Sequence, residues 1–366
     1  MKLKRKLLRF VFLLALLAVC IYVLPHCLAY YNKFVFYPFQ SLRGVLLGWV
    51  PFSIGDVAYV LAGAALLYTV VRWVYFIIRF GIYKQRLAAS VLDTINASLF
   101  GYAFFILGWG ANYAKQPLRE HWHFPLAEYN TRNEARTADS LAMIAFDRFL
   151  VAQLNECAPH YRTLSFAEIN TRAVAFYRSY TDSKVKKNGL GVKPSMFGYF
   201  MERVAVDGYY NPFSGEGQVN GRLPAFMLPF VVCHEMAHQA GIAAEGDANL
   251  MAYAIGTQGK DAVFNYSSYL NIWLYVNNRL YRRDSVSAKK FEAQLNKLTT
   301  AHIDTLEELS KKYNNEATKY STEFYDTYLK IHKQKEGIRS YGNVATSAWQ
   351  LEKERIAGRA AVIKIP

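Results

Sequence analysis

The segment His234-Glu235-Met236-Ala237-His238 has the residue types and the spacing of a catalytic zinc site. Residues four apart lie on one face of a helix, so two imidazoles at this spacing can reach one metal ion. Glu235 is adjacent to His234, where it can take a proton from a water molecule that Zn²⁺ activates. The spacing therefore predicts a metal helix in which His234 and His238 are ligands and Glu235 is the general base of a hydrolysis.

The residues after this pentapeptide indicate the third ligand. Gly241 is a natural helix stop that lets the chain turn back, and a second apolar helix begins near Glu245. A carboxylate from Glu245 would complete a His₂Glu set and leave the fourth position for water. Asp247 competes for this role, but its side chain is shorter and points elsewhere on the helix. We expect Glu245 to bind the metal, and Asn249 and Asp247 to support the ligands by hydrogen bonds from outside. The structural alternative is a buried polar helix pair with no metal.

Three apolar segments near the N-terminus are candidates for membrane-spanning helices, at about 8–25, 54–79 and 88–110. A spanning helix needs roughly 20 predominantly apolar residues. The first segment could instead be a cleaved signal peptide, but its apolar run is long and no obvious cleavage site follows it. Three such segments in a row with basic flanks argue against core helices of a soluble protein.

The basic residues predict the orientation of these spans. They cluster before the first span and around the connection between the second and third spans, at Lys2, Lys4, Arg5, Lys6, Arg72, Arg79, Lys84 and Arg86. Loops rich in Lys and Arg stay in the cytoplasm. We therefore expect a multi-pass protein of the cytoplasmic membrane with a cytoplasmic N-terminus and with everything after 112 outside, in the periplasm of a Gram-negative cell.

The fold class follows from this division. We expect a mainly α protein, with a three-helix transmembrane region at 1–112 and an extracytoplasmic α+β metallopeptidase domain at 113–366, which the family resemblance described below implies to be zincin-like. Periodicity predicts helices at 137–156 and 165–180 and a mainly helical chain from 257 to 357. Short strands are predicted at 199–206 and 217–220, and an edge strand that could pair with an extended peptide at 220–224.

Composition limits the possible partners. The net charge of +15 could suggest nucleic acid, but the basic residues are interspersed with acidic ones, and no basic stripe is present. We expect a lipid bilayer and a protein or peptide substrate as partners, and no nucleic acid; the oligomeric state stays open. The four cysteines form no CxxC pair, which argues against a thiolate zinc site or a redox motif. Cys157 and Cys233 could pair or stay free.

The stretch 229–241 with 245–249 resembles a bacterial family of three-span membrane proteins catalogued as domain of unknown function 3810 and common in Bacteroidetes. The resemblance extends to 51–56, 109–113, 214–216 and 337–342, and thus covers nearly the full chain. It implies a zincin-like domain and brings no established substrate. The metal helix and the Glu245 helix alone are also similar to those of gluzincin peptidases.

Other residues give weaker indications. His121 and His123 flank Trp122 just after the third span, and we interpret them as structural. Tyr209, Tyr210 and Tyr341 are candidate donors to the oxyanion of a tetrahedral intermediate. Glu216 is interpreted as a solvated loop carboxylate rather than a ligand or base.

Together these features predict a membrane-anchored zinc metallopeptidase that hydrolyses peptide bonds, with Glu235 as general base. Two alternatives stay open: a non-catalytic zinc-binding membrane module, and an amidase acting on cell-wall fragments. A transporter is disfavoured because three spans leave little room for a pathway.

Overall fold

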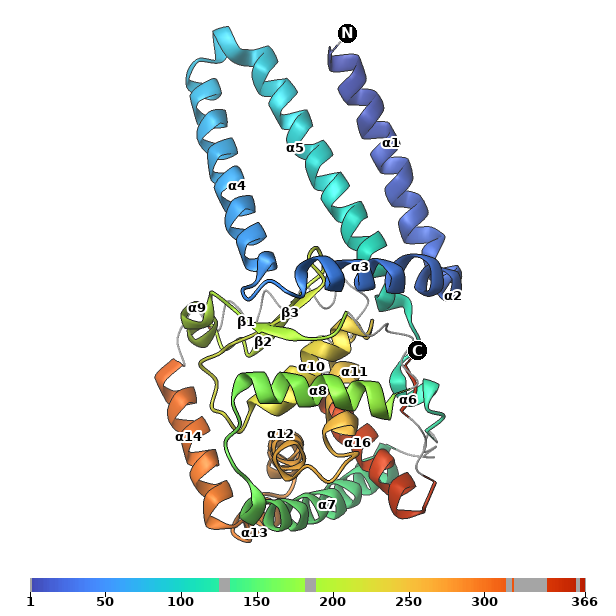
Figure 1. Ribbon diagram of the computed structural model, residues 1–366, viewed down its shortest axis with the longest axis vertical. Helices are drawn as coiled ribbons and strands as arrows, with labels where there is room; N and C mark the ends of the chain where they lie inside the picture. Colours follow the sequence, from blue (N-terminus) through green and yellow to red (C-terminus); the bar gives the residue numbers. More distant parts are fainter. Residues whose placement is uncertain are drawn as a thin grey trace.

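The computed structural model describes residues 2–124, 132–181, 189–313, 318, 341–359 and 363–365. These residues are mainly helical. Three long apolar helices stand side by side on a helical domain that contains one small sheet, as Figure 1 shows.

The three long helices are α1 (Lys2–Tyr22), α4 (Ile54–Ile78) and α5 (Phe80–Gly108), and all three are long and apolar enough to cross a membrane. The prediction of three spans is confirmed to that extent. The third helix was predicted to begin at 88 and begins at Phe80, because Lys84 and Arg86 are good helix formers and do not interrupt it. Arg79 alone separates α4 from α5, so these two spans form a hairpin.

Short helical segments connect α1 to α4, and no helix was predicted there. They are η1 (Leu24–His26), α2 (Leu28–Tyr31), the π-helical η2 (Asn32–Phe36) and α3 (Tyr37–Leu47). α3 lies across the lower ends of the spans in Figure 1. Its Leu42 and Leu46 are exposed, whereas its Gln40 and Arg43 are buried against the domain. α3 therefore marks the level at which the spans meet the domain.

The domain begins directly after α5. Its first helices are η3 (Gly110–Ala114), α6 (Leu118–His121), α7 (Arg132–Cys157), η4 (Ala158–His160) and α8 (Phe166–Tyr180). Both helices predicted at 137–156 and 165–180 are thus confirmed. Ser165 begins α8 with a capping box, in which its side chain accepts from the Glu168 amide and Glu168 accepts in return.

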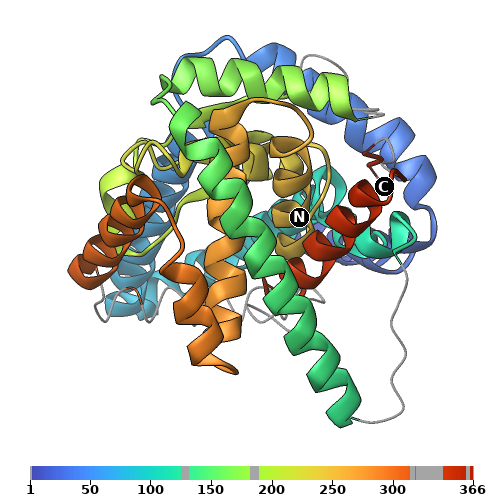
Figure 2. The same cartoon turned by 90° about the horizontal axis from the view of Figure 1, so that it is seen from below.

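The second half of the domain is also mainly helical in its described residues, and for the range from 257 to 357 this was predicted. It contains α9 (Gly198–Arg203), α10 (Leu228–Gln239), α11 (Glu245–Gly256), α12 (Ala262–Tyr281), α13 (Ser285–Glu292), α14 (Lys297–Tyr313) and α16 (Tyr341–Ile356). Figure 2 shows α7 beside α12 on the side of the domain far from the spans. Buried Asp147 of α7 joins them by accepting hydrogen bonds from Trp273 and Asn277 of α12.

One three-stranded sheet lies between α3 and α10, in the order β1-β3-β2. Its strands are β1 (Val192–Pro194), β2 (Gly208–Asn211) and β3 (Glu216–Val219). β1 is parallel and β2 antiparallel to β3. The strand predicted at 217–220 is confirmed as β3, whereas β1 and β2 were not predicted.

Two strand predictions were wrong. The predicted strand at 199–206 is largely α9, because a short apolar run fits both periods and here Met201 is buried as a helical residue. The predicted edge strand at 220–224 is a turn, in which the amide oxygen of Asn220 accepts from the backbone N–H of Arg222. β2 forms the edge of the sheet instead.

α10 is the central helix of the domain. It packs on the sheet on one side and against α8, α11 and α12 on the others. Every residue of α10 except His234 is buried. A helix that is apolar on nearly all faces belongs in a core, and the run Phe230-Val231-Val232-Cys233 satisfies that requirement just before the histidines.

Candidate metal centre

The end of α10 is shaped by Gly241, whose φ of +87° favours glycine. The N–H groups of Gly241 and Ile242 donate to the carbonyls of His238 and Ala237, each at 3.0 Å, which is the pattern of a Schellman cap. This turn brings the Ile242 carbonyl back to the helix, where it lies 2.7 Å from Nδ1 of His238. The predicted helix stop therefore also orients a predicted ligand.

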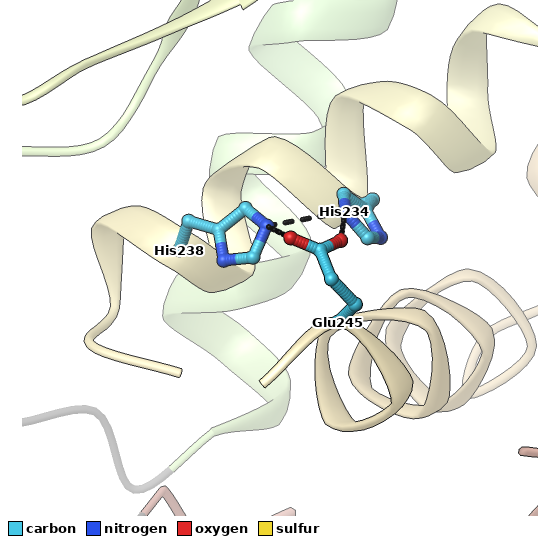
Figure 3. Close-up of side chains that lie close together, drawn as sticks. All are labelled: His234, His238 and Glu245. Atoms are coloured by element: carbon cyan, nitrogen blue, oxygen red, sulfur yellow. Dashed lines mark hydrogen bonds and ion pairs between the residues drawn. The ribbon is translucent and has the colours of Figure 1, made fainter. Parts of the chain in front are cut away.

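Three candidate ligand atoms converge between α10 and α11 (Figure 3). Nε2 of His234 lies 3.2 Å from Nε2 of His238 and 3.2 Å from Oε2 of Glu245. Nε2 of His238 lies 3.5 Å from Oε1 of Glu245. Among the described residues, this is the one group of histidine, cysteine and acidic side chains close enough to hold a metal ion.

The outer nitrogens of both histidines determine which nitrogen can bind a metal. Nδ1 of His238 donates to the Ile242 carbonyl, and Nδ1 of His234 donates to the amide oxygen of Asn249 at 2.8 Å. A neutral imidazole that carries its proton on Nδ1 presents a lone pair at Nε2. Two imidazole nitrogens and a carboxylate thus face one another, and this arrangement can hold a cation.

The spacing of these atoms fits zinc. Two nitrogens bound at about 2.0–2.1 Å in a tetrahedral site lie about 3.3 Å apart, close to the 3.2 Å between the two Nε2 atoms. Two imidazoles and one carboxylate are also the donor set of many catalytic zinc sites. The residues present therefore fit the predicted metal.

The two carboxylates on α11 lie in different places. Glu245 points at the histidines, whereas Oδ2 of Asp247 accepts a hydrogen bond from the backbone N–H of Leu118 at 3.2 Å. Asp247 thus joins α11 to α6, and this hydrogen bond is to the backbone rather than to a candidate ligand. Asn249, which lies one helical turn after Glu245, does contact a candidate ligand, because its side-chain oxygen accepts a hydrogen bond from His234.

Charge and burial influence the candidate ligands in opposite directions. Burial alone would lower the pKa of His238, but the Glu245 carboxylate raises it to about 9. Burial would raise the pKa of Glu245, but His238 and His234 hold it well below its usual range. The Glu245 carboxylate is therefore ionised at neutral pH, the form in which it binds metals.

Glu235 lies on the sheet side of α10, in a space that two glycines provide. A Cβ at Gly208 of β2 would lie 2.5 Å from Oε1 of Glu235, and a Cβ at Gly217 of β3 would lie 3.0 Å from its Cβ. Oε2 of Glu235 is buried and has no hydrogen-bond partner among the described residues. Burial raises the pKa of this carboxyl to about 7, although the two histidines oppose the shift.

The three candidate ligands and Glu235 line one cavity of about 680 Å³. Its walls come from α10, α11, α12, β2, α9 and, unexpectedly, from α4 and the segment that follows α5. Two lining residues that we did not predict have groups that could act on a substrate: Asp207 and Tyr275. No sequence signal distinguishes Tyr275 among 27 tyrosines.

The edge strand β2 passes along this cavity. The backbone N–H of Asn220 donates to the Asp207 carbonyl at 2.8 Å. Because hydrogen-bonded pairs alternate along an antiparallel ladder, Gly208 and Tyr210 direct their N–H and C=O groups away from β3. Both residues line the cavity, so the open edge of the sheet faces it.

The two tyrosines predicted as oxyanion donors on β2 are hydrogen-bonded elsewhere. The Tyr209 hydroxyl donates to Asp56 of α4, and the Tyr210 hydroxyl donates to Gln40 of α3 at 2.9 Å. These bonds tie β2 to the N-terminal helices α3 and α4 instead. The side chain of Tyr341 lies outside the described residues.

Glu216 is not the solvated loop carboxylate that we expected. It is buried, pairs with Lys193 at 2.6 Å and accepts the backbone N–H of Gly55 at 2.7 Å. A carboxylate at a helix N-terminus compensates the free N–H groups and the helix dipole. Glu216 thus anchors the first turn of α4 to β3.

The remaining candidates take no part in the cluster. His121 and His123 are not in the one described group that could hold a metal. Cys157 and Cys233 are both buried free thiols rather than a disulfide.

The comparison with known proteins adds one finding. The model of a family described as "Protein of unknown function (DUF3810)" matches residues 31–346. No curated protein and no solved structure matches the chain. The matched range extends from the last residue of α2 to the beginning of α16 and includes His234, His238 and Glu245.

Proposed function

The chain belongs to the DUF3810 family, whose function is unknown, and on that premise we propose from its site that it is a membrane-anchored zinc metallopeptidase. One observation carries the proposal. The Nε2 atoms of His234 and His238 and the carboxylate of Glu245 converge in a cavity that is also lined by Glu235, a residue with a buried oxygen that has no partner among the described residues.

His234, His238 and Glu245 would hold the zinc ion. When bound, zinc supplies Lewis-acid polarisation of a carbonyl group and lowers the pKa of a nearby water molecule. Asn249 and the Ile242 carbonyl keep the two imidazoles in the tautomer and orientation that this binding needs.

Glu235 is the general base. Its position next to His234 on α10 and the unpartnered Oε2 suit it to accept a proton from the attacking water. The same oxygen then returns a proton to the leaving amine. Gly208 and Gly217 keep the space for this carboxylate, so the sheet and the helix together position the base.

The open edge of β2 favours an extended polypeptide as the substrate. The outward N–H and C=O groups of Gly208 and Tyr210 could pair with a peptide backbone that lies in the cavity. A small sheet with an antiparallel edge strand beside the metal helix supports a zincin-like domain. The edge strand also favours an extended peptide over the glycan part of a cell-wall fragment, because a glycan has no backbone N–H and C=O groups to pair with a strand.

The distribution of charge supports an extracytoplasmic site. The N-terminal lysines and arginines begin α1, and Arg79 joins α4 to α5 at the same end of the spans, far from the domain in Figure 1. By the positive-inside rule that end is cytoplasmic. The domain and its metal cluster would then lie outside the cytoplasmic membrane.

The decisive experiment compares the full-length wild type with Glu235→Gln, both purified in detergent. We expect stoichiometric zinc in both proteins, cleavage of a mixed peptide library by the wild type, and no cleavage by the variant. Glu308→Gln, an exposed change on α14, is the matched control and should behave as wild type. Zinc binding without any cleavage would favour the non-catalytic module, and release of muropeptide fragments without peptide cleavage would favour the amidase.

A further inference from the structure

The candidate metal centre lies directly against the end of a membrane span. Trp109 follows the last residue of α5, and its indole Nε1 donates to the backbone carbonyl of His238 at 3.1 Å. The same ring packs edge-to-face on the His238 imidazole. Lys115 adds a second link by donating to the Gly241 carbonyl at 3.0 Å. One side chain therefore separates a candidate zinc ligand from the point where the chain leaves α5.

A second span forms part of the cavity wall. Tyr59 lies in the second turn of α4 and lines the cavity that contains Glu235 and the ligands. Its ring is 6.3 Å from the ring of Tyr209 on the edge strand β2. The first turn of α4 is held in place by Glu216, and by Asp56, which accepts from the Met196 amide at 2.7 Å. The wall is thus a fixed part of the site.

The face of α4 above Tyr59 has no partner in the described part of the chain. Residues 58–68 are exposed on all sides of the helix. Gly63 lies one turn beyond Tyr59 on the same face, and a Cβ added to Gly63 would meet nothing within 4 Å. In Figure 1, α4 and α5 meet at their far ends and diverge toward the domain. Small residues on a spanning helix let another helix approach closely.

Resting on the proposed peptidase function, we propose that the substrate is a polypeptide anchored in the same membrane by a spanning helix. That helix lies against the Gly63 face of α4, and the segment that follows it passes Tyr59 into the cavity. Water adds across one peptide bond: the C–N bond breaks, the acyl carbon gains the hydroxyl, and the amine nitrogen gains the proton.

The position of the candidate metal centre limits which peptide bond of the substrate can be cleaved. An extended chain advances about 3.3–3.6 Å per residue, and Trp109 places the centre beside the end of α5. The cleaved bond should therefore lie within about ten residues of the substrate's own spanning helix. A soluble peptide has no spanning helix to bind to α4, so its rate of cleavage serves as the comparison.

The first experiment uses the full-length protein in phosphatidylcholine vesicles with synthetic probes. Each probe joins a Leu-Ala spanning helix, a Gly-Ser spacer and the same cleavable peptide, selected from the library that the wild type cuts in detergent. We expect the probe with a spacer of about 5 residues to be cut roughly tenfold faster than one with about 30, because effective concentration falls steeply with linker length. Equal rates for both spacers, or for the free peptide, would overturn the proposal.

Gly63→Trp tests the docking face directly. We expect it to slow cleavage of the short-spacer probe at least fivefold while the free peptide in detergent is cut at the wild-type rate. Gly81→Trp is the matched control, because Gly81 also has open space around its Cβ position but lies at the opposite end of the hairpin. An unchanged rate for Gly63→Trp would exclude this face as the docking site.

A binding readout separates this inference from the peptidase proposal. We would introduce Gly63→Cys or Gly81→Cys into a protein that also carries Glu235→Gln and Cys27→Ser, since Cys27 is the exposed native thiol. Each variant would be mixed with a probe that has one cysteine in its spanning helix, and the mixture would then be oxidised. A disulfide at Gly63→Cys and not at Gly81→Cys supports helix docking even if the wild type cuts nothing. Equal or no crosslinking at the two positions contradicts it, as would a crosslink between two copies of the protein in place of the probe.

Discussion

Nδ1 of His234 on α10 donates a 2.8 Å hydrogen bond to the side-chain oxygen of Asn249 on α11. Asn249 lies one turn after Glu245, so the helix that carries one candidate ligand also orients another. The two helices therefore define the geometry of the centre jointly, and each ligand depends on the packing of α10 against α11.

Loss of the Asn249 amide should weaken zinc binding without removing a ligand. Replacement of a residue that orients a metal-binding histidine typically costs 10–100-fold in affinity, and we expect a loss of roughly that size for Asn249→Ala. Asn249→Asp keeps an acceptor for Nδ1 and should retain most of the affinity. Competition with a chromogenic chelator measures both, and equal affinities for wild type and Asn249→Ala would contradict the role assigned to this bond.

The third ligand can be assigned by metal analysis. Glu245→Ala should lose zinc on dialysis against a weak chelator, because two imidazoles alone hold the ion far less tightly. Asp247→Asn should keep it, since Asp247 contacts the Leu118 backbone rather than the histidines. If Glu245→Ala keeps stoichiometric zinc during the same dialysis as the wild type, the assignment of Glu245 as the third ligand is wrong.

Gly208→Ala should reduce activity with little effect on zinc content. The new Cβ would lie 2.5 Å from Oε1 of Glu235 and 2.9 Å from the Gln218 carbonyl, so the carboxylate must shift. A displacement of about 1 Å at a catalytic group can cost on the order of 10²-fold in rate. Gly221→Ala is the control, because its Cβ would meet Pro194 at an ordinary 3.7 Å. Similar rates for both variants would show that Gly208 is not needed to position Glu235.

Asp147 should make stability depend on pH. Burial raises its pKa from 3.8 to about 6, against the hydrogen bonds from Trp273 and Asn277, with a small further rise from Glu292. The unfolded chain therefore releases this proton first. The stabilisation is present in full below pH 3.8 and is lost as pH rises through about 6.

The size of this effect follows from the shift, at about 1.4 kcal/mol per pKa unit and so on the order of 3 kcal/mol in total. Asp147→Asn cannot titrate, and between pH 4 and pH 7 its unfolding temperature in detergent should fall less than that of the wild type. Subtracting the pH profile of the unfolding temperature of Asp147→Asn from that of the wild type removes the contributions of the other titratable groups. Parallel pH profiles would indicate that Asp147 titrates normally.

The local features of the site could be predicted from short-range patterns. The H-E-x-x-H spacing places two histidines on one helix face, and Gly241 marks the end of that helix, because both depend only on residues a few positions apart. The choice of Glu245 over Asp247 also followed from helix geometry. Long apolar runs identified the three candidate spans for the same reason.

What could not be predicted depends on contacts between distant segments. Trp109 contacts His238 across 129 positions of sequence, and Glu216 contacts Gly55 across 161; no periodicity reports such pairs. The four-residue strand β2 is too short to distinguish from its surroundings, and its residues do not alternate between buried and exposed.

The burial of α10 limits which amino-acid substitutions this helix can accept. Eleven of its twelve residues are buried, and the exception is the candidate ligand His234. Almost any substitution along this helix would disturb the core as well as the chemistry, so loss of activity in a random mutational scan would not distinguish a catalytic residue from a packing residue. Only isosteric changes such as Glu235→Gln can separate the two roles. In evolution, substitutions along α10 should be tolerated only together with compensating substitutions in β3, α8, α11 and α12.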